Sequence, residues 1–521
     1  MLIENGKIKI LDSDKYSFFS CLFSGALLYC KWIFEWIINP DTIWNGILYK
    51  DSYGWEDSLG RIGLRYFASL KSFFILPSLT VVFCIVVNSV LAVLLCRIFI
   101  IKNKFLSTLT GIIVSCSPSF CSLLTYYYTS DAYMFACLCS VLFVFFIKNR
   151  GKMPFIISVI LLSASLFLYQ AYLGTAISLS LFYLIYNLLI DRPNLKDYFS
   201  QVFRFMIGGI AAICLYFVIY KIVCFTDNIT PTASRSFSTM GKLPLSELPL
   251  LLINAYRSFF DYYISDNLFM RSFMNGGIIN AFLFLSCFFA TLILSIKQKL
   301  SKTEAIIIVV FLFLAPLATM SISIYAYGTS LYDVTGIIMI PHFNYIYVYI
   351  IALVSCLNFE MKNTLISFIK KSILCLVIAV CMIQSMYVQI FAMCVEKDVK
   401  QTDTVSQLMI SKIYDISSEQ DNIKVAIIGD FHAGNFPDAY PELREIVKGT
   451  AAVYGCFWAD ASGSENCWIN YLKQFKGVCF TPCNNDEIRI IETSDRFEKM
   501  TIFPSDGSVV LIDDIVVVKL S

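Results

Sequence analysis

The chain has 521 residues, of which 58% are hydrophobic and only 15% are charged, and its mean hydropathy is +0.70. A soluble domain cannot bury that much apolar side chain, so the composition predicts a polytopic membrane protein. Residues 1–394 carry 28 Lys and Arg against 18 Asp and Glu, whereas residues 395–521 carry 12 against 20. A nucleic-acid partner is not expected, because no basic stripe with interleaved aromatics lies outside the short loops. Chemistry that needs several histidines is excluded, because the chain has only His342 and His432.

The N-terminal segment 1–16 is polar and mixed in charge. The apolar run that follows it contains Lys31 and Glu35 and has no small-residue cleavage site, so we expect an uncleaved anchor rather than a signal peptide. Further runs long enough to cross roughly 30 Å of hydrocarbon recur as far as Cys394. We therefore predict an all-α membrane domain over 17–394 with about eleven transmembrane helices, at 17–38, 72–96, 105–124, 131–147, 154–168, 174–190, 203–223, 276–296, 304–325, 335–358 and 372–394.

The loops between these spans differ in their content of Lys and Arg, and this bias predicts the orientation. Five short connections hold 15 of them and are assigned to the cytoplasm: Arg97, Lys102, Lys104, Lys148, Arg150, Lys152, Arg192, Lys196, Arg204, Lys297, Lys299, Lys302, Lys362, Lys370 and Lys371. The opposite loops are longer in total and hold eight: Lys50, Arg61, Arg65, Lys71, Arg235, Lys242, Arg257 and Arg271. The N-terminus is then cytoplasmic, and residues 395–521 lie outside the membrane.

Ten of the carboxylates in the membrane part fall in outward loops or at outer span ends: Asp41, Asp51, Glu56, Asp57, Asp131, Asp227, Glu247, Asp261, Asp266 and Asp333. The ordinary polarity of loops explains most of them equally well. It explains Asp131 poorly, because this residue lies in a very short connection between three tyrosines, at 126–128, and an apolar span.

Residues 395–521 are predicted to form a small extracytoplasmic α/β domain. Its expected elements are a strand at 424–428 that ends at Gly429, a helix opening at 440–447, a helix over 468–475 and a hairpin over 508–520 that turns at Asp513 and Asp514. The junction at Gly429 is only a weak phosphate-loop signal, because no Gly-Lys-Ser/Thr follows at the required spacing.

The chain has 19 cysteines, of which 15 lie at or before Cys394, mostly in apolar spans where they behave as small hydrophobes. The remaining four, which fall in the external tail, are candidates for disulfides in an oxidising compartment: Cys456, Cys467, Cys479 and Cys483. Three pairings are possible. A zinc site that includes the Cys479-x-x-x-Cys483 pair is the less favoured alternative, and no other metal-ligand spacing stands out.

The first outward loop, residues 39–71, combines acids, aromatics and a Gly-Arg pair, with Asp41, Trp55, Glu56, Asp57 and Arg61 in order along it. Aromatic faces suit sugar rings, a carboxylate can accept the proton of a sugar hydroxyl, and an arginine fork matches a phosphate. Transfer from a phosphate-activated lipid sugar needs these parts. An interfacial aromatic belt with snorkelling charges explains the same residues without any chemistry.

Two further outward elements repeat this theme, the first around Asp131 and Tyr133 and the second at Tyr169, Gln170 and Tyr172. They are candidates to bind substrate in the same cavity, although belt residues explain each of them in isolation. The large external loop 225–275 supplies further cations, any of which could hold a second phosphate or lie in solvent: Arg235, Lys242 and Arg257.

Taken in order, these motifs resemble the polytopic glucosyl transferases of the serotype-converting (Gtr type II) group, which have the GT-C architecture. The matching stretches are Asn39-Pro40-Asp41, Trp55-Glu56-x-x-x-Gly60-Arg61, Ser130-Asp131-Ala132-Tyr133, Tyr169-Gln170-Ala171-Tyr172 and the ending from Phe503 to Leu520. They are spread over almost the whole chain. Each is short, so their order and spacing carry the resemblance.

The resemblance implies an enzyme of the bacterial cytoplasmic (inner) membrane that takes a hexose, typically glucose, from a polyprenyl-phosphate carrier. It would add this sugar outside the membrane to a surface polysaccharide such as the O-antigen of lipopolysaccharide, the modification that underlies serotype conversion. The lipid-linked sugar is a co-substrate, and no further cofactor is implied. Asp41 and Glu56 match the positions that supply the catalytic base in such enzymes, and Arg61 matches the Gly-Arg. Many members carry paired acids early in this loop, whereas here the adjacent pair, Glu56 and Asp57, comes later.

The mechanism that we expect is a single inverting displacement. Asp41 first, or Glu56 second, removes the proton of the acceptor hydroxyl as its oxygen attacks the anomeric carbon, and the lipid phosphate leaves toward Arg61 or Arg257. Two alternatives are an O-antigen polymerase or ligase, whose functional loop usually comes late in the chain, and a flippase or transporter for lipid-linked sugars. Transporters bind near the bilayer midplane and often show internal repeats. The middles of these spans hold almost no charge, and no repeat is visible.

Overall fold

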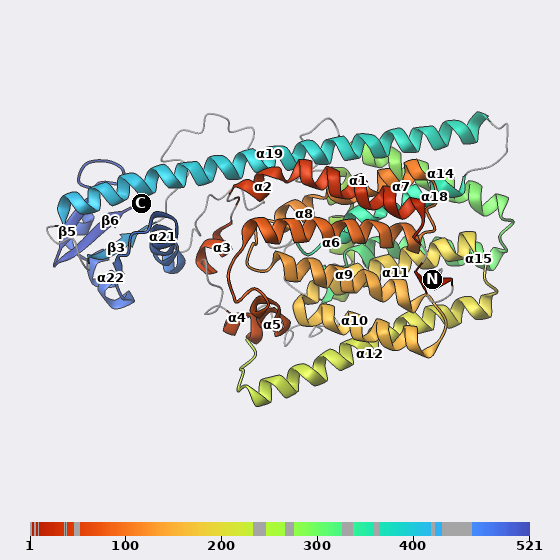
Figure 1. Ribbon diagram of the computed structural model, residues 1–521, viewed down its shortest axis with the longest axis horizontal. Helices are drawn as coiled ribbons and strands as arrows, with labels where there is room; N and C mark the ends of the chain where they lie inside the picture. The colour runs from red at the N-terminus through yellow and green to blue at the C-terminus, as the bar shows by residue number, and fades with distance from the viewer. Residues whose placement is uncertain are drawn as a thin grey trace.

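The computed structural model describes residues 3–4, 7–8, 10–35, 37, 39–45, 53–232, 246–265, 276–325, 337–357, 364–417, 423–429 and 461–521. These residues form an elongated bundle of helices with a small sheet domain at one end (Figure 1). In the polar N-terminal segment, strands β1 (Ile3–Glu4) and β2 (Lys7–Ile8) pair antiparallel.

Helix is found in the described part of all eleven predicted spans. The helices of the bundle are α1 (Asp12–Leu28), α2 (Cys30–Phe34), α6 (Pro77–Ile98), α7 (Lys104–Ser115), α8 (Pro118–Leu123), α9 (Ser130–Ile147), α10 (Lys152–Leu168), η2 (Gln170–Tyr172), α11 (Leu173–Ile190), α12 (Leu195–Thr226), α13 (Leu248–Phe260), η3 (Asp261–Ser265), α14 (Gly276–Lys297), α15 (Lys302–Thr319), α16 (Ser321–Tyr325), η4 (Pro341–Asn344), α18 (Tyr345–Cys356) and α19 (Thr364–Ile416). Seven helices in the described residues are long and apolar enough to cross a membrane. The figure of eleven crossings stays a prediction.

Local sequence signals explain where several of these helices begin. Asn103 and Asn194 each accept a hydrogen bond from a backbone N–H of the first turn, and Ser301 does the same in a capping box with Glu304. The predicted span 105–124 is divided into α7 and α8 at Pro118, which has no N–H to continue a helical ladder.

Polar side chains inside the bundle are paired with one another. Asn344 donates to Gln384 at 2.7 Å and to the carbonyl of Ile113 at 2.7 Å, and Gln384 donates back at 3.2 Å. The ring nitrogens of His342 lie 3.2 Å from Oγ1 of Thr175 and 2.8 Å from the carbonyl oxygen of Thr319. Each contact joins separate helices, as expected where lipid offers no hydrogen bonds.

The C-terminal domain is built on a four-stranded sheet with the order β4-β3-β6-β5. Strand β3 (Lys424–Ile428) pairs parallel with β4 (Thr481–Pro482) and β6 (Ile515–Lys519), and β5 (Val509–Ile512) pairs antiparallel with β6. The helices of this domain are α21 (Ala461–Lys476), α22 (Asn485–Glu492) and α23 (Asp495–Glu498). The predicted strand at 424–428, helix over 468–475 and hairpin are confirmed, and the hairpin turns at Asp513 and Asp514 with positive φ angles of 47° and 64°. The predicted helix opening at 440–447 lies outside the described residues.

Helix α19 links the two parts and continues well past 394, where the predicted span ends. The reason is its second apolar face, on which Val405, Met409 and Ile413 recur at intervals of four residues and pack in the core of the sheet domain. The last turns of α19 therefore pack with the C-terminal domain. The sequence analysis predicted that this domain begins at residue 395, after the end of the last membrane span.

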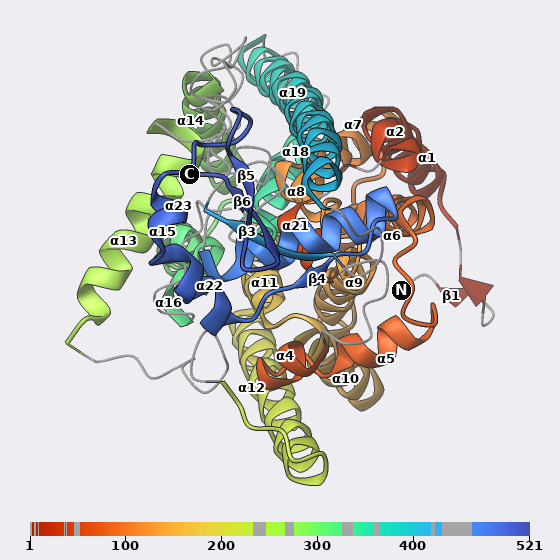
Figure 2. The same cartoon turned by 90° about the vertical axis from the view of Figure 1, so that its left-hand side faces the viewer.

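Three short helices of the first outward loop lie at the end of the bundle that faces the sheet domain: α3 (Pro40–Asn45), α4 (Tyr53–Ser58) and α5 (Gly63–Ser69) (Figures 1 and 2). Helix α21 of the sheet domain packs against α3. Tyr471 of α21 is 2% exposed and belongs to the core of the bundle, and Phe475 packs beside it. Helix α3 is thus in contact with both the membrane bundle and the sheet domain.

Candidate functional site

The turn between α4 and α5 is the structural centre of the site. Its backbone reverses through hydrogen bonds from Arg61 N to Glu56 O at 2.9 Å and from Gly60 N to Asp57 O at 3.0 Å. Gly60 has a φ of +87°, and a Cβ added there would lie 2.4 Å from the hydroxyl oxygen of Tyr216. Only glycine meets both demands without strain, so the Gly-Arg pair noted in the sequence reflects the close approach of this turn to α12.

Arg61 joins three of the motifs that the sequence singled out. Its Nη1 donates to Oε2 of Glu56 at 2.9 Å and to the hydroxyl of Tyr133 at 3.0 Å. Its guanidinium carbon lies 4.9 Å from the ring centroid of Tyr169. The rings of Tyr133 and Tyr169 are themselves stacked, with centroids 4.0 Å apart and planes at 15°. The structure thus brings one acid, one arginine and two aromatic rings from three segments into one cluster.

The buried Nε atom of Arg61 has no hydrogen-bond partner within the described part of the chain. The side chain is 18% exposed, and that of Glu56 is 9% exposed. A guanidinium cannot be deprotonated in a protein, so this N–H is a permanent donor. The cluster therefore keeps an unused cationic donor for an anion.

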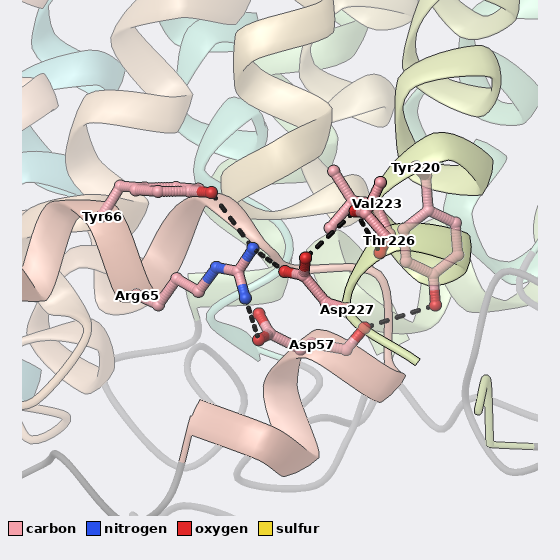
Figure 3. A network of polar contacts seen from close by, with 7 residues as sticks. All are labelled: Asp57, Arg65, Tyr66, Tyr220, Val223, Thr226 and Asp227. Carbon is pink, nitrogen blue, oxygen red and sulfur yellow. Dashed lines mark hydrogen bonds and ion pairs between the residues drawn. The ribbon is translucent and has the colours of Figure 1, made fainter. Parts of the chain in front are cut away.

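Asp57 and Glu56 are adjacent in α4 but have different partners. Oδ2 of Asp57 accepts from Arg65 Nη1 at 3.2 Å, and Arg65 Nη2 donates to Asp227 at 2.6 Å and to the hydroxyl of Tyr66 at 3.0 Å (Figure 3). Burial raises the pKa of Asp57 to about 6, against the opposing effect of Arg65 and with support from the charges of Asp227 and Glu56. The hydrogen bond from Arg65 instead holds the pKa of Asp227 below its usual range.

Asp131, predicted to bind substrate, is part of a buried ion pair. Its Oδ2 lies 2.7 Å from Nζ of Lys71, and the two side chains are only 10% and 11% exposed. Its Oδ1 accepts from the backbone N–H of Ala132 at 2.9 Å. This pair joins the segment after α5 to the start of α9, which places Tyr133 beneath the first loop.

Asp41 lies in α3, and its side chain is half-buried. The neighbouring Thr42 donates to the carbonyl of Thr125 at 2.8 Å, which fixes α3 against the connection between α8 and α9. Because α21 packs on α3, Asp41 lies on a helix at the junction between the bundle and the C-terminal domain.

The other predicted residues are placed as follows. Gln170 is buried behind the α4–α5 turn and donates to Leu59 O and to the hydroxyl of Tyr216, both at 3.0 Å. Tyr172 is fully buried and donates to Ile338 O at 3.1 Å. Trp55 is 56% exposed. Arg257 is exposed in α13, 3.6 Å from Asp261, and within the described residues no contact joins it to the Arg61 cluster.

Several residues that the sequence analysis singled out lie outside the described part of the chain, namely Asp51, Arg235, Lys242, Asp266, Asp333 and Cys456. Nothing is described of the side chain of Cys467; Cys479 is exposed and Cys483 is buried. The predicted disulfides and the zinc alternative therefore stay predictions. Among the residues that the structure describes, no group of three His, Cys, Asp or Glu is placed to hold a metal ion.

Sequence reasoning missed the contacts of Arg65, Lys71, Asp227 and Tyr216. The spacing of residues in the sequence offered two signals for some of these contacts. Arg61 and Arg65 are four residues apart, as are Tyr216 and Tyr220, which is the spacing of residues on one face of a helix. No local signal pairs Lys71 with an acid 60 residues away.

A family model described as glucosyl transferase GtrII matches residues 48–349, more than half of the chain. The chain belongs to the glucosyl transferase GtrII family. The resemblance expected from the sequence is thus confirmed, and membership indicates a membrane glucosyltransferase. The matched range includes Glu56, Arg61, Tyr133 and Tyr169, whereas Asp41 and the sheet domain lie outside it. Neither the curated proteins nor the solved structures include a significant match to this chain.

Proposed function

We propose that this GtrII family member transfers a hexose, most simply glucose, from a polyprenyl-phosphate sugar to a polysaccharide outside the bacterial cytoplasmic membrane, such as an O-antigen. The observation that carries the proposal is the Arg61 cluster, in which a buried guanidinium with an unused Nε–H adjoins a carboxylate and two stacked aromatic rings. Cation, carboxylate and ring faces are the groups that phosphate, hydroxyl and sugar ring require. The cluster lies in the first loop, which the charge bias assigns to the outer side.

The donor class follows from that orientation. A nucleotide sugar is made and kept in the cytoplasm, so an enzyme that works on the outer side needs a sugar carried across on a lipid. In the reaction, the acceptor oxygen forms a bond to the anomeric carbon, and the bond from that carbon to the phosphate oxygen breaks. The polyprenyl phosphate leaves with the electron pair. Arg61 would bind this phosphate through its Nε–H, because phosphate oxygens accept charge-assisted hydrogen bonds from a guanidinium.

The acceptor proton needs a base, and Asp41 is the first candidate. A polysaccharide is bulky and approaches from outside, so its base has to be reachable; Asp41 is half-buried, whereas Glu56 is 7% exposed. Glu56 also accepts a hydrogen bond from Arg61 at 2.9 Å, so its carboxylate is already engaged by the guanidinium. Glu56 then orients Arg61 for the leaving phosphate, and Asp41 takes the proton.

The test is to express the chain in a host that makes O-antigen and supplies polyprenyl-phosphate glucose, and to weigh the surface polysaccharide by mass spectrometry. We expect one added hexose per repeat unit, with loss of the addition in Asp41→Asn at equal membrane abundance. Glu56→Gln should retain slow transfer with a raised KM for the lipid donor. Arg150→Lys, at the other end of the bundle, is the matched control. An addition that survives Asp41→Asn but not Glu56→Gln would make Glu56 the base. No added hexose, with purified donor and acceptor also supplied in vitro, would overturn the proposed reaction.

A further inference from the structure

The C-terminal end of α4 is attached to α12 through an unbroken row of backbone carbonyls. The hydroxyl of Tyr220 lies 3.3 Å from Asp57 O and 3.2 Å from Ser58 O. Gln170 donates to the next carbonyl, that of residue 59, and Tyr216 donates to that of Gly60 at 2.9 Å. The carbonyls of the four successive residues 57–60 thus accept hydrogen bonds from side chains of α12 and η2.

One side-chain bridge completes this attachment. Arg65 of α5 donates to Asp57 of α4 and to Asp227, the residue that follows the last turn of α12 (Figure 3). Asp227 is itself oriented, because its backbone N–H donates to Val223 O at 2.9 Å and its Oδ1 accepts from Thr226 at 3.0 Å. One guanidinium therefore ties α4 and α5, which are neighbours in the sequence, to the end of α12, where Asp227 lies 162 residues after Arg65.

The two faces of α4 and α5 have different partners. Glu56 and Arg61 contact each other and the stacked tyrosines, while Asp57 and Arg65 contact the end of α12. Arg61 lies in the turn directly before α5, and Arg65 lies in the first turn of α5. A shift of α4 and α5 relative to α12 would therefore move both guanidinium groups together. Fixing Arg65 fixes the direction from which Arg61 approaches an anion.

We propose that Arg65, bridging Asp57 and Asp227, is a positioning residue for the transfer reaction: it locks the α4–α5 turn onto the end of α12 and so sets the placement of Arg61 and Glu56. The effect on catalysis rests on the proposed function. The attachment of the α4–α5 turn to α12 through Arg65 does not. The Asp227 side chain is 37% exposed. Exposed ion pairs contribute little to global stability, so removing this contact tests placement of the loop rather than folding of the protein.

The experiment compares Asp227→Asn with the conservative Asp227→Glu and with Asp197→Asn. The last variant breaks the exposed Arg150–Asp197 pair, 2.9 Å in length, at the opposite end of the bundle. Two properties are measured for each protein in lipid nanodiscs: kcat and KM for transfer from polyprenyl-phosphate glucose, and hydrogen exchange of the backbone amides of residues 53–69.

We expect Asp227→Asn to lower kcat by about 10- to 100-fold, the range known for a misplacement of about 1 Å, with KM for the acceptor within about twofold of wild type. Exchange over 53–69 should be faster by a similar factor. Asp227→Glu should restore most of both properties, and Asp197→Asn should change neither. Faster exchange with unchanged kcat would overturn the positioning role, and unchanged exchange would overturn the lock itself. If the wild type transfers no sugar, the exchange data still decide the lock, and the proposed reaction alone has failed.

Discussion

The guanidinium of Arg61 lies across the ring of Tyr169, with Cζ 4.9 Å from the ring centroid. This contact joins the first outward loop to the connection between α10 and α11, more than 100 residues later. Tyr133, from a third segment, stacks on Tyr169 and also accepts the Nη1–H of Arg61. The aromatic pair therefore supports the cation directly and is more than an interfacial belt.

Removing the aromatic support should weaken binding of the lipid donor. Tyr169→Leu deletes a cation–π contact worth about 0.5–2 kcal/mol, so we expect KM for polyprenyl-phosphate glucose to rise about 3- to 30-fold with a smaller change in kcat. Tyr133→Phe keeps the stacked ring and loses one hydrogen bond to the guanidinium, of a kind worth about 1.5–3 kcal/mol, so the same KM should rise at least as much. Initial-rate kinetics at saturating acceptor measure both. An unchanged KM in both variants would contradict the supporting role of the two rings.

Arg61→Lys tests whether the site needs a guanidinium or only a positive charge. A lysine ammonium is a point charge that cannot contact Glu56, Tyr133 and a phosphate in the geometry of a planar fork. We expect kcat/KM to fall by at least about tenfold, or about 1.4 kcal/mol, at unchanged membrane abundance. The control is Arg150→Lys at the opposite end of the bundle. Equal activity of Arg61→Lys and wild type would show that this residue supplies only charge.

The raised pKa of Asp57 predicts a pH-dependent contribution to stability. The carboxyl group titrates near pH 4 when the chain is unfolded and at about pH 6 when it is folded. Between these values the folded state binds the proton more tightly, so the contribution of Asp57 to stability decreases as pH rises toward 6 and is constant above it. The charged groups that face it are Arg65, Asp227 and Glu56.

Asp57→Asn removes this titration, so the wild-type Tm should rise by a few degrees relative to that of the variant when pH falls from 7.5 to 5. Fluorescence-monitored unfolding in detergent at both pH values gives the difference between the two proteins. Asp57→Glu, which still titrates, should follow the wild type. A difference in Tm between wild type and Asp57→Asn that is independent of pH would show that Asp57 titrates in its ordinary range.

The parts of the fold that could be predicted are those with a local cause. Long apolar runs predicted the helices, and the short apolar run from Val425 to Ile428, followed by Gly429, predicted β3. The length of helix α19 was not predicted, because the apolar residues of its second half, Val405, Met409 and Ile413, recur only at intervals of four. A hydropathy average over this segment does not detect such a stripe. The turn at Asp513 and Asp514 was visible because short polar residues tolerate a positive φ.

The sequence predicted which residues belong to the candidate site but not which of them contact one another. The sequence named Glu56, Arg61, Tyr133 and Tyr169, yet nothing in it shows that one arginine contacts all three of the others. It gave the adjacent acids Glu56 and Asp57 the same role, whereas their side chains point to opposite partners. Pairing depends on how α9, α10 and α12 pack around the first loop, and this is a tertiary property.

The Lys71–Asp131 pair separates a structural role from substrate binding. Asp131→Asn leaves the ammonium of Lys71 buried without its counter-charge, which costs about 3 kcal/mol in comparable buried pairs, so Tm and membrane abundance should fall. The double variant Lys71→Met, Asp131→Asn removes the stranded charge, and we expect most of the stability to return. If Asp131 acts only through Lys71, sugar transfer returns with the stability, as measured by mass spectrometry of the polysaccharide. A double variant that is stable but inactive would instead support the hypothesis that Asp131 binds the sugar. In that protein the unpaired charge is gone, so the loss of activity would come from the missing carboxylate itself.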